Sequence, residues 1–333
     1  MEKILTVVIP SYNVEKYLDQ TLQSFIDVSI MEKLEVLVVD DGSKDRTAEI
    51  GEKYVLRYPE TFRVIRKKNG GHGSTINVGI TEANGKYFKV VDGDDWVETK
   101  DFAELVLKLE NCDSDFVMTN FKEVDDQTRD SVLWDYKKMP DGKEMSFAEA
   151  AEKNIMPMHA LTIKTAILQK QNIRMDEHCF YVDVEYILYP VPYVMTVTRF
   201  DLTVYMYRVA LATQSVSMTG FQTHINDHIR VIMNVSDYIN AHKEKGLADE
   251  KIKYMETRIA QMVDMQVSIF LSFPKSDKKI QRKFKEFDEK LKEKNEEIYE
   301  KAAEYRAVLR LLRKTNFKYY RFLTWLSDVR NGK

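Results

Sequence analysis

The chain has 333 residues, of which 44% are hydrophobic and 31% charged, and its formal net charge is -3 at pH 7. This composition supports a sizeable core and excludes general disorder, and the near-neutral charge argues against binding to nucleic acid. The only cysteines, Cys112 and Cys179, exclude a disulfide scaffold and a cysteine-rich zinc site and fit a reducing cytoplasm. No window approaches about 18 apolar residues, and Met1–Asn13 is too short and too soon polar for a signal peptide, so we expect neither a spanning helix nor a leader.

In the first part of the chain, short apolar runs alternate with stretches of helical spacing. The runs are nearly continuous and rich in β-branched residues, which is typical of strands buried on both faces. The predicted strands are Ile4–Ile9, Leu34–Val39, Phe62–Ile65, Tyr87–Val91 and Asp115–Thr119. The predicted helices are Glu15–Asp27, Lys44–Arg57, Ser74–Ala83 and Lys100–Glu110. This alternation predicts an α/β fold with a mostly parallel, Rossmann-like sheet covered by helices on both sides.

The alternation fades after about residue 120. We expect loops or a hairpin over Asp125–Lys143 and a strand over Leu202–Arg208. Short helices are predicted at Ser146–Asn154 and Thr165–Gln171, and longer ones at Asp249–Ser272 and, with a break left open, at Lys278–Leu312. We place a boundary near Gly220, which separates residues 1–219 from a helical C-terminal region, residues 220–333.

Polar residues follow three of the predicted strands, where ligands bind in such sheets. Asp92 and Asp94 could hold a divalent cation that takes its remaining ligands from a substrate phosphate and water, whereas Asp95 could cap the next helix. Tyr12 could stack on a flat base, and Asp41 could either accept a hydrogen bond from a pyrimidine N–H or form a structural turn. The glycine-rich segment 69–73 could offer backbone N–H groups to a diphosphate, although it lacks the lysine of a P-loop.

The segment Tyr305–Lys333 is basic and aromatic, with eight Lys or Arg residues and Asp328 as its single acid. Such a segment could lie on an anionic membrane face as a peripheral contact. The alternative is a terminal helix whose apolar side packs on the protein.

Several of these segments occur in the order that resembles family 2 glycosyltransferases, which have the GT-A fold. The matching segments are Thr6–Asn13, Leu37–Ser43, Asn69–Gly79, Val90–Trp96, Phe180–Glu185, Tyr205–Arg208 and Ser215–Ser217. The resemblance implies an inverting enzyme that moves a sugar from a UDP-sugar to a hydroxyl of a glycan, lipid-linked or polymer acceptor in bacterial cell-surface polysaccharide synthesis. It also implies a nucleotide-sugar half over about residues 1–120, an acceptor half over about 121–219, and a cytoplasmic enzyme, at the inner membrane face if the basic segment binds there.

The resemblance assigns roles to individual residues. It implies that Asp94, with Asp92 beside it or on the ribose, ligates Mn²⁺ or Mg²⁺, that Asp183 is the general base, and that Arg208 stabilises the leaving diphosphate. The other implied donor-binding residues are Pro10, Tyr12, Asn13, Asp41, Asn69, Gly71 and Asn77.

Two positions depart from the family pattern, since Val182 stands where a glutamate is common and Ile76 where an arginine often precedes the asparagine. The first makes Glu185 a rival to Asp183, which could also be a helix N-cap. His159 could bind acceptor hydroxyls or be a buried, satisfied histidine. The alternative functions are a nucleotidyltransferase and a non-catalytic nucleotide-sugar-binding subunit. The chain could also form a homo-oligomer.

Overall fold

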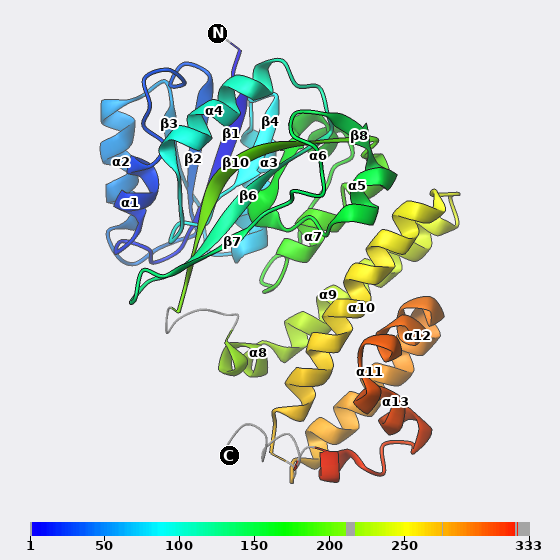
Figure 1. Ribbon diagram of the computed structural model, residues 1–333. Helices are drawn as coiled ribbons and strands as arrows, with labels where there is room; N and C mark the ends of the chain where they lie inside the picture. Colours follow the sequence, from blue (N-terminus) through cyan, green and yellow to red (C-terminus); the bar gives the residue numbers. More distant parts are fainter. Residues whose placement is uncertain (1, 211–216, 275, 324, 326–333) are drawn as a thin grey trace. The chain divides into compact units, whose positions relative to one another are not determined.

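The computed structural model describes residues 2–210, 217–274, 276–323 and 325. The chain divides into two compact units, Met1–Ala212 and Thr213–Lys333, so the division precedes the predicted boundary at Gly220 (Figure 1).

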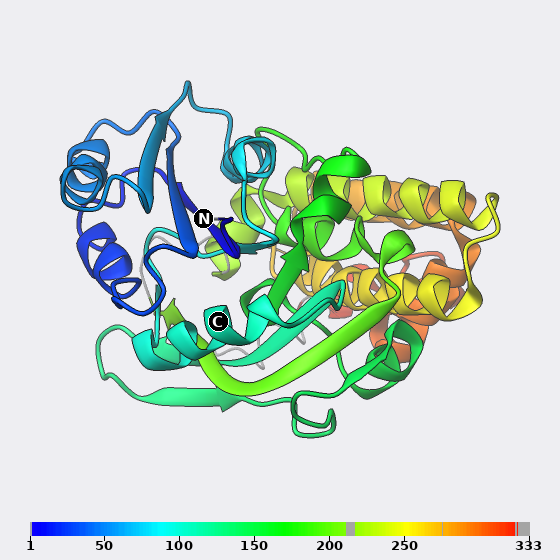
Figure 2. The ribbon, with the colours of Figure 1, turned by 90° about the horizontal axis from the view of Figure 1, so that it is seen from above.

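The first unit begins with a parallel sheet whose strands end at the predicted polar motifs. The strands are β1 (Leu5–Ser11), β2 (Leu34–Asp40), β3 (Phe62–Arg66) and β4 (Tyr87–Val90). Every residue of β1 and β2 is buried, as their continuous apolar runs predict. The helices are α1 (Leu18–Gln23), α2 (Thr47–Arg57) and α3 (His72–Glu82). Figure 2 shows α1 and α2 on one face of these strands and α3 on the other.

The remainder of the first unit extends this sheet in mixed directions. Its strands are β5 (Trp96–Val97), β6 (Phe116–Asp125), β7 (Ser131–Trp134), β8 (Glu144–Ser146), β9 (Leu161–Lys164) and β10 (Thr196–Val209). The strand order is β3-β2-β1-β4-β9-β6-β10-β5, with β7 on β6 and β8 on β10. Strand β9 is antiparallel to both β4 and β6, so the sheet is mixed rather than mostly parallel. The predicted hairpin is present, because β6 and β7 pair antiparallel.

Short helices connect these strands. They are α4 (Thr99–Glu110), α5 (Phe147–Lys153), η1 (Met158–Ala160), α6 (Thr165–Lys170), α7 (Asp183–Leu188) and η2 (Val191–Tyr193). Ser146 caps α5 in a capping box with Glu149, which fixes where this helix begins.

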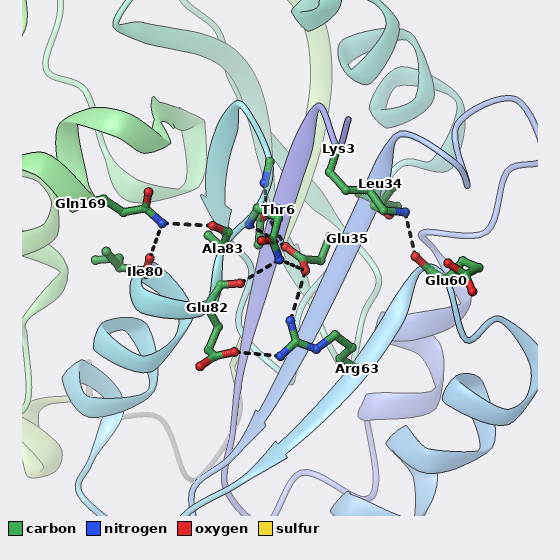
Figure 3. A network of polar contacts seen from close by, with 12 residues as sticks. Lys3, Thr6, Leu34, Glu35, Glu60, Arg63, Ile80, Glu82, Ala83 and Gln169 are labelled. Atoms are coloured by element: carbon green, nitrogen blue, oxygen red, sulfur yellow. Dashed lines mark hydrogen bonds and ion pairs between the residues drawn. The ribbon is translucent and has the colours of Figure 1, made fainter. Parts of the chain in front are cut away.

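A polar network around the buried Thr6 and Glu35 joins the strands at the end of the sheet opposite the motifs (Figure 3). Glu35 of β2 accepts a hydrogen bond of 2.6 Å from Thr6 of β1 and bonds of 2.8 and 3.0 Å from Asn84. Arg63 of β3 bridges Glu35 and Glu82 at 3.3 and 2.8 Å. Because each buried polar group here has a partner, the network fixes the register of three strands without contributing to the motif end.

The second unit is helical. Its helices are α8 (Met218–Thr223), α9 (Ile225–Lys243), α10 (Asp249–Leu271), α11 (Lys278–Lys294), α12 (Glu296–Tyr305) and α13 (Ala307–Lys314). The stretch Lys278–Leu312 is therefore broken twice, at Asn295 and at Arg306, and the Asn295 side chain caps α12 by accepting from the N–H of Ile298. In the described parts of both units, every helix is too short or too polar to cross a membrane.

Candidate active site

A cavity of about 440 Å³ opens at the carboxyl ends of β1 and β2. It is lined by Pro10, Ser11, Tyr12, Asp41, Asn69, Gly71, His72, Thr75, His178, Cys179 and Phe180. The cavity is thus lined by five residues that were predicted to bind the donor: Pro10, Tyr12, Asp41, Asn69 and Gly71. The volume lies within the usual range for small-molecule sites.

The segments after β1 and β2 are tied together by Asn13. Its φ angle of 54° places it in the left-handed region, and its backbone N–H donates to Oγ of Ser43 at 3.0 Å. Its Oδ1 accepts from the N–H of Lys44 at 2.9 Å. Asn13 therefore shapes the turn beside Tyr12, whose ring stays 48% exposed and can meet a ligand.

The two aspartates after β2 have different partners. Asp40 forms the turn, because its Oδ1 accepts from the N–H of Ser43 at 3.1 Å. The carboxylate of Asp41 accepts from the N–H groups of Gly70 and Gly71 at 2.9 and 2.8 Å, and from Nζ of Lys67 at 2.7 Å. This corrects one expectation: these two N–H groups bind Asp41 and are not directed at a diphosphate.

The glycine-rich segment is clamped to the loop before α7. The N–H of His178 donates to the carbonyl of Gly70 at 2.6 Å. A Cβ atom at Gly73 would lie 2.2 Å from the carbonyl oxygen of Asp176, so only glycine allows this approach. Asn77 donates to the carbonyl of Met175 at 2.9 Å and accepts from its N–H at 2.8 Å. Asn77, expected to bind the donor, holds the two halves of the first unit together.

The segment after β4 carries the predicted metal ligands. Nε2 of His72 lies 2.8 Å from Oδ1 of Asp92. Burial disfavours a charged His72, but attraction by Asp92, followed by Asp183 and Asp94, outweighs it and raises the pKa of His72. Burial, together with repulsion from Asp92, raises the pKa of Asp94 to about 6. Two neighbouring carboxylates in a buried setting repel each other, and a bound cation would relieve that repulsion.

Asp95 faces the interior. Its carboxylate accepts from the hydroxyl of Tyr205 at 2.6 Å and from the N–H of Arg208 at 2.7 Å. Burial, followed by repulsion from Asp94 and Asp92, raises the pKa of Asp95 well above its usual range. Asp95 thus fastens the segment after β4 to β10.

The side chain of Arg208 packs against the same segment after β4 and is only 2% exposed. Its guanidinium donates to the carbonyl of Asp94 at 2.6 Å and to Oε1 of Gln20 at 2.8 Å, and it also pairs with Asp126. It lies 4.8 Å from the ring centroid of Tyr17 and 4.6 Å from that of Trp96. These contacts indicate that Arg208 positions the backbone of Asp94. The sequence predicted a different contact for Arg208, with the leaving diphosphate.

Asp183 is the first residue of α7, one position after the N-cap Val182. It is half-buried, and its charge is one of those that raise the pKa of His72. Its rival Glu185 is fully buried, and Oε2 of Glu185 accepts from the N–H of Asp176 at 2.7 Å. Of the two, Asp183 is the more exposed.

His159 lies among aromatic rings, with centroids 4.9 Å from Tyr205 and 4.3 Å from Tyr207. Burial lowers the pKa of His159 to about 4, so the ring is neutral. These contacts fit the alternative of a packed histidine better than an acceptor ligand. Ile76 and Val182, the two departures from the family pattern, are buried in the core.

Sequence reasoning gave little weight to several residues that the fold brings to the cavity. Lys67, which orients Asp41, stands in no motif, and Phe180, 41% exposed at the cavity, begins the matching segment Phe180–Glu185 but received no role from it. His72 lies next to Asp92, and the only sequence feature that pointed to a role for His72 was its place in the glycine-rich segment. Ser215 and Val216, of the predicted Ser-x-Ser segment, lie outside the described residues, and Ser217 caps α8.

Comparisons with known proteins identify the family of this domain. Residues 6–169 match the model for glycosyl transferase family 2. The uncharacterized glycosyltransferase EpsJ of Bacillus subtilis (strain 168) is 36% identical over 121 residues, which make up 36% of this chain and 35% of EpsJ. The poly(ribitol-phosphate) beta-N-acetylglucosaminyltransferase TarS of Staphylococcus aureus (strain Mu50) is 31% identical over 120 residues, or 36% of this chain and 21% of TarS. The matched segment thus spans about a third of EpsJ and less of TarS.

The fold is shared over a longer stretch. The crystal structure of S. aureus TarS 1–349 in complex with UDP-GlcNAc superposes with a TM-score of 0.69 at 20% identity, covering 99% of this chain and 92% of that one. The first unit therefore has the GT-A fold. Residues 6–169 thus form a family 2 glycosyltransferase domain.

Proposed function

We propose that the protein is an inverting, metal-dependent glycosyltransferase that moves a sugar from a UDP-sugar to an acceptor hydroxyl in bacterial cell-surface polysaccharide synthesis. The observation that carries this proposal is the meeting of Tyr12 and Asp41 with His72, which in turn bonds Asp92, at one cavity. This arrangement offers a base-binding wall and a carboxylate pair at neighbouring positions, as a nucleoside diphosphate requires. The family match and the similarity to TarS, which is named a poly(ribitol-phosphate) beta-N-acetylglucosaminyltransferase, support a glycan, lipid-linked or polymer acceptor for this protein.

In this proposal the exposed ring of Tyr12 stacks on the uracil, with Pro10 beneath it. Three hydrogen-bond donors already fix the carboxylate of Asp41, so its orientation toward the cavity is set before the donor arrives. A preorganised acceptor discriminates a base N–H without a further ordering cost.

The carboxylates of Asp94 and Asp92 fit Mn²⁺ or Mg²⁺, since hard divalent cations take one or two carboxylates and complete their shell with phosphate oxygens and water. Among the described residues no group of three or more His, Cys, Asp or Glu side chains forms a metal site alone, which agrees with a metal that shares its ligands with the donor. When bound, such an ion offsets the negative charge of the departing diphosphate.

Asp183 would take the proton from the acceptor hydroxyl. The hydroxyl oxygen forms a bond to the anomeric carbon while the bond from that carbon to the diphosphate oxygen breaks, and its electron pair leaves with UDP. Attack from the face opposite the diphosphate inverts the anomeric configuration. The free cysteines Cys112 and Cys179, both buried, agree with a cytoplasmic enzyme.

A screen of UDP-sugars with Mn²⁺, without acceptor, tests the proposal through slow donor hydrolysis. We expect UDP to be released from one donor and the release to require the metal. Release of pyrophosphate from UTP would indicate a nucleotidyltransferase, and binding of UDP without turnover of any donor or acceptor would indicate a non-catalytic subunit. Either result would contradict the proposal.

A further inference from the structure

The last described part of the second unit presents exposed aromatic and basic side chains together. We define the terminal surface as Lys314, Lys318, Tyr319, Arg321, Phe322 and Trp325. The exposed fractions of Tyr319, Phe322 and Trp325 are 52%, 54% and 42%. The rings of Phe322 and Trp325 are neighbours, with centroids 5.8 Å apart.

The opposite side of this segment is anchored in the core of the second unit. The ring of Phe317 packs edge-on against Phe284 at 5.0 Å, and the hydroxyl of Tyr320 donates to the carbonyl of Phe270 at 2.9 Å. Leu312 and Leu323 are also buried. Packing on the protein therefore accounts for one set of apolar residues, and the exposed rings are a second set that this packing leaves in solvent.

The charges divide in the same way. Arg306 and Arg313 face inward and pair with Asp264 and Asp288. In the described residues, Lys314, Lys318 and Arg321 form no ion pair, and residues 305–325 contain no Asp or Glu. The terminal surface is thus uniformly positive.

We propose that the terminal surface docks on the anionic face of a lipid bilayer. Residues 320–323 and 325 are helical, and positions 321, 322 and 325 recur at the spacing of an interfacial amphipathic helix, with Lys318 in the turn that precedes them. Aromatic rings favour the headgroup region, and each basic side chain near an anionic surface contributes roughly a fivefold gain in binding. A symmetric dimer through this surface would oppose like charges, so a second copy fits less well.

Co-sedimentation of the full chain with vesicles tests this inference, and no sugar donor is needed, so it stands apart from the proposed function. We expect pelleting with phosphatidylcholine vesicles that contain phosphatidylglycerol, but not with phosphatidylcholine alone, and weaker binding at high salt. Lys318→Glu with Arg321→Glu should reduce binding at least about 25-fold. Phe322→Ser with Trp325→Ser should reduce it about tenfold or more.

The matched control is Lys53→Glu with Lys100→Glu, which makes the same charge change at exposed positions of the first unit and should retain binding. All variants change exposed side chains, and thermal unfolding checks that each is folded. Negligible pelleting of the unaltered chain, an equal loss in the control, or no effect of removing the two rings would overturn the inference. Binding to poly(U) in place of vesicles, lost in the same variants, would overturn it in favour of single-stranded nucleic acid.

Discussion

Asn77 and Met175 form a reciprocal pair of hydrogen bonds across 98 positions of sequence, 2.9 Å from Nδ2 to the carbonyl and 2.8 Å from the N–H to Oδ1. Asn77 is buried in α3, and Met175 lies in the loop between α6 and α7, which leads to Asp183. The side chain of Asn77 therefore joins α3 to this loop, with the same pair of hydrogen bonds that a peptide group makes within a strand pair.

Replacing Asn77 should weaken the connection between α3 and the loop that contains Met175. Asn77→Ala leaves the N–H and carbonyl of Met175 buried without their present partner, and we expect the free energy of unfolding to fall by roughly 2–4 kcal/mol. Urea unfolding followed by circular dichroism measures the change. Asn77→Asp, which can still accept from the N–H, should lose less, and an equal loss in both variants would show that the reciprocal pair is not the cause.

Asp94 is expected to matter for turnover and little for folding. Because the Asp94 carboxylate is the predicted metal ligand, Asp94→Asn should reduce Mn²⁺-dependent UDP release at least about 100-fold while the melting temperature stays within a few degrees. Asp95→Asn is the matched comparison, since Asp95 is bonded to Tyr205 and Arg208 and its loss should lower stability. Full activity of Asp94→Asn at any Mn²⁺ concentration would remove the metal assignment.

Arg208 offers a choice between two roles. If it positions the loop of Asp94, as its contacts with the Asp94 carbonyl and the Tyr17 and Trp96 rings indicate, Arg208→Lys should lower the free energy of unfolding by roughly 2–3 kcal/mol. If its main role is on the leaving diphosphate, the same change should reduce kcat with unfolding unchanged. Thermal unfolding and steady-state kinetics on one preparation separate the two outcomes.

The second unit should lose stability in mild acid. His228 is buried beside Gln266, at 2.8 Å from Nδ1 to Oε1, and burial lowers the pKa of His228 to about 4. The unfolded chain binds the proton near pH 6.5, so the stabilisation present above that pH is lost as pH falls toward 4, by about 2 kcal/mol at pH 5. His228→Gln, which keeps an amide beside Gln266, should flatten this dependence in urea unfolding between pH 8 and pH 5. An unchanged slope would assign the acid sensitivity to other groups, such as His159.

Much of the sheet follows from local pattern, and the exceptions have long-range causes. Strands β1 to β4 lie within about two residues of the predicted ranges, because continuous β-branched runs have few alternatives. Strand β9 is four residues long and exists because β4 and β6 flank it, a tertiary effect without a local signal. The helix predicted over Glu15–Asp27 shortens to α1 (Leu18–Gln23).

The site divides in the same manner. Tyr12 and Asp41 are candidates from the sequence because each stands directly after a buried strand, and Asp94 because it stands four residues after one, where ligands bind in such sheets. What could not be predicted is which polar groups are used internally. Asp95 meets Tyr205 across 110 positions, and only this long-range contact distinguishes Asp95 from the proposed ligand Asp94 one residue away. The clamp by Asn77 is the second such case.

In the proposed mechanism Asp183 activates the acceptor while the donor binds at the cavity beside Tyr12. Asp183→Asn can be compared with the unaltered enzyme for UDP affinity by calorimetry and for sugar transfer to an acceptor. We expect UDP affinity to stay within about twofold and transfer to fall between about 100-fold and 10,000-fold, as loss of a general base requires. Unchanged transfer by Asp183→Asn would show that Asp183 is not the general base.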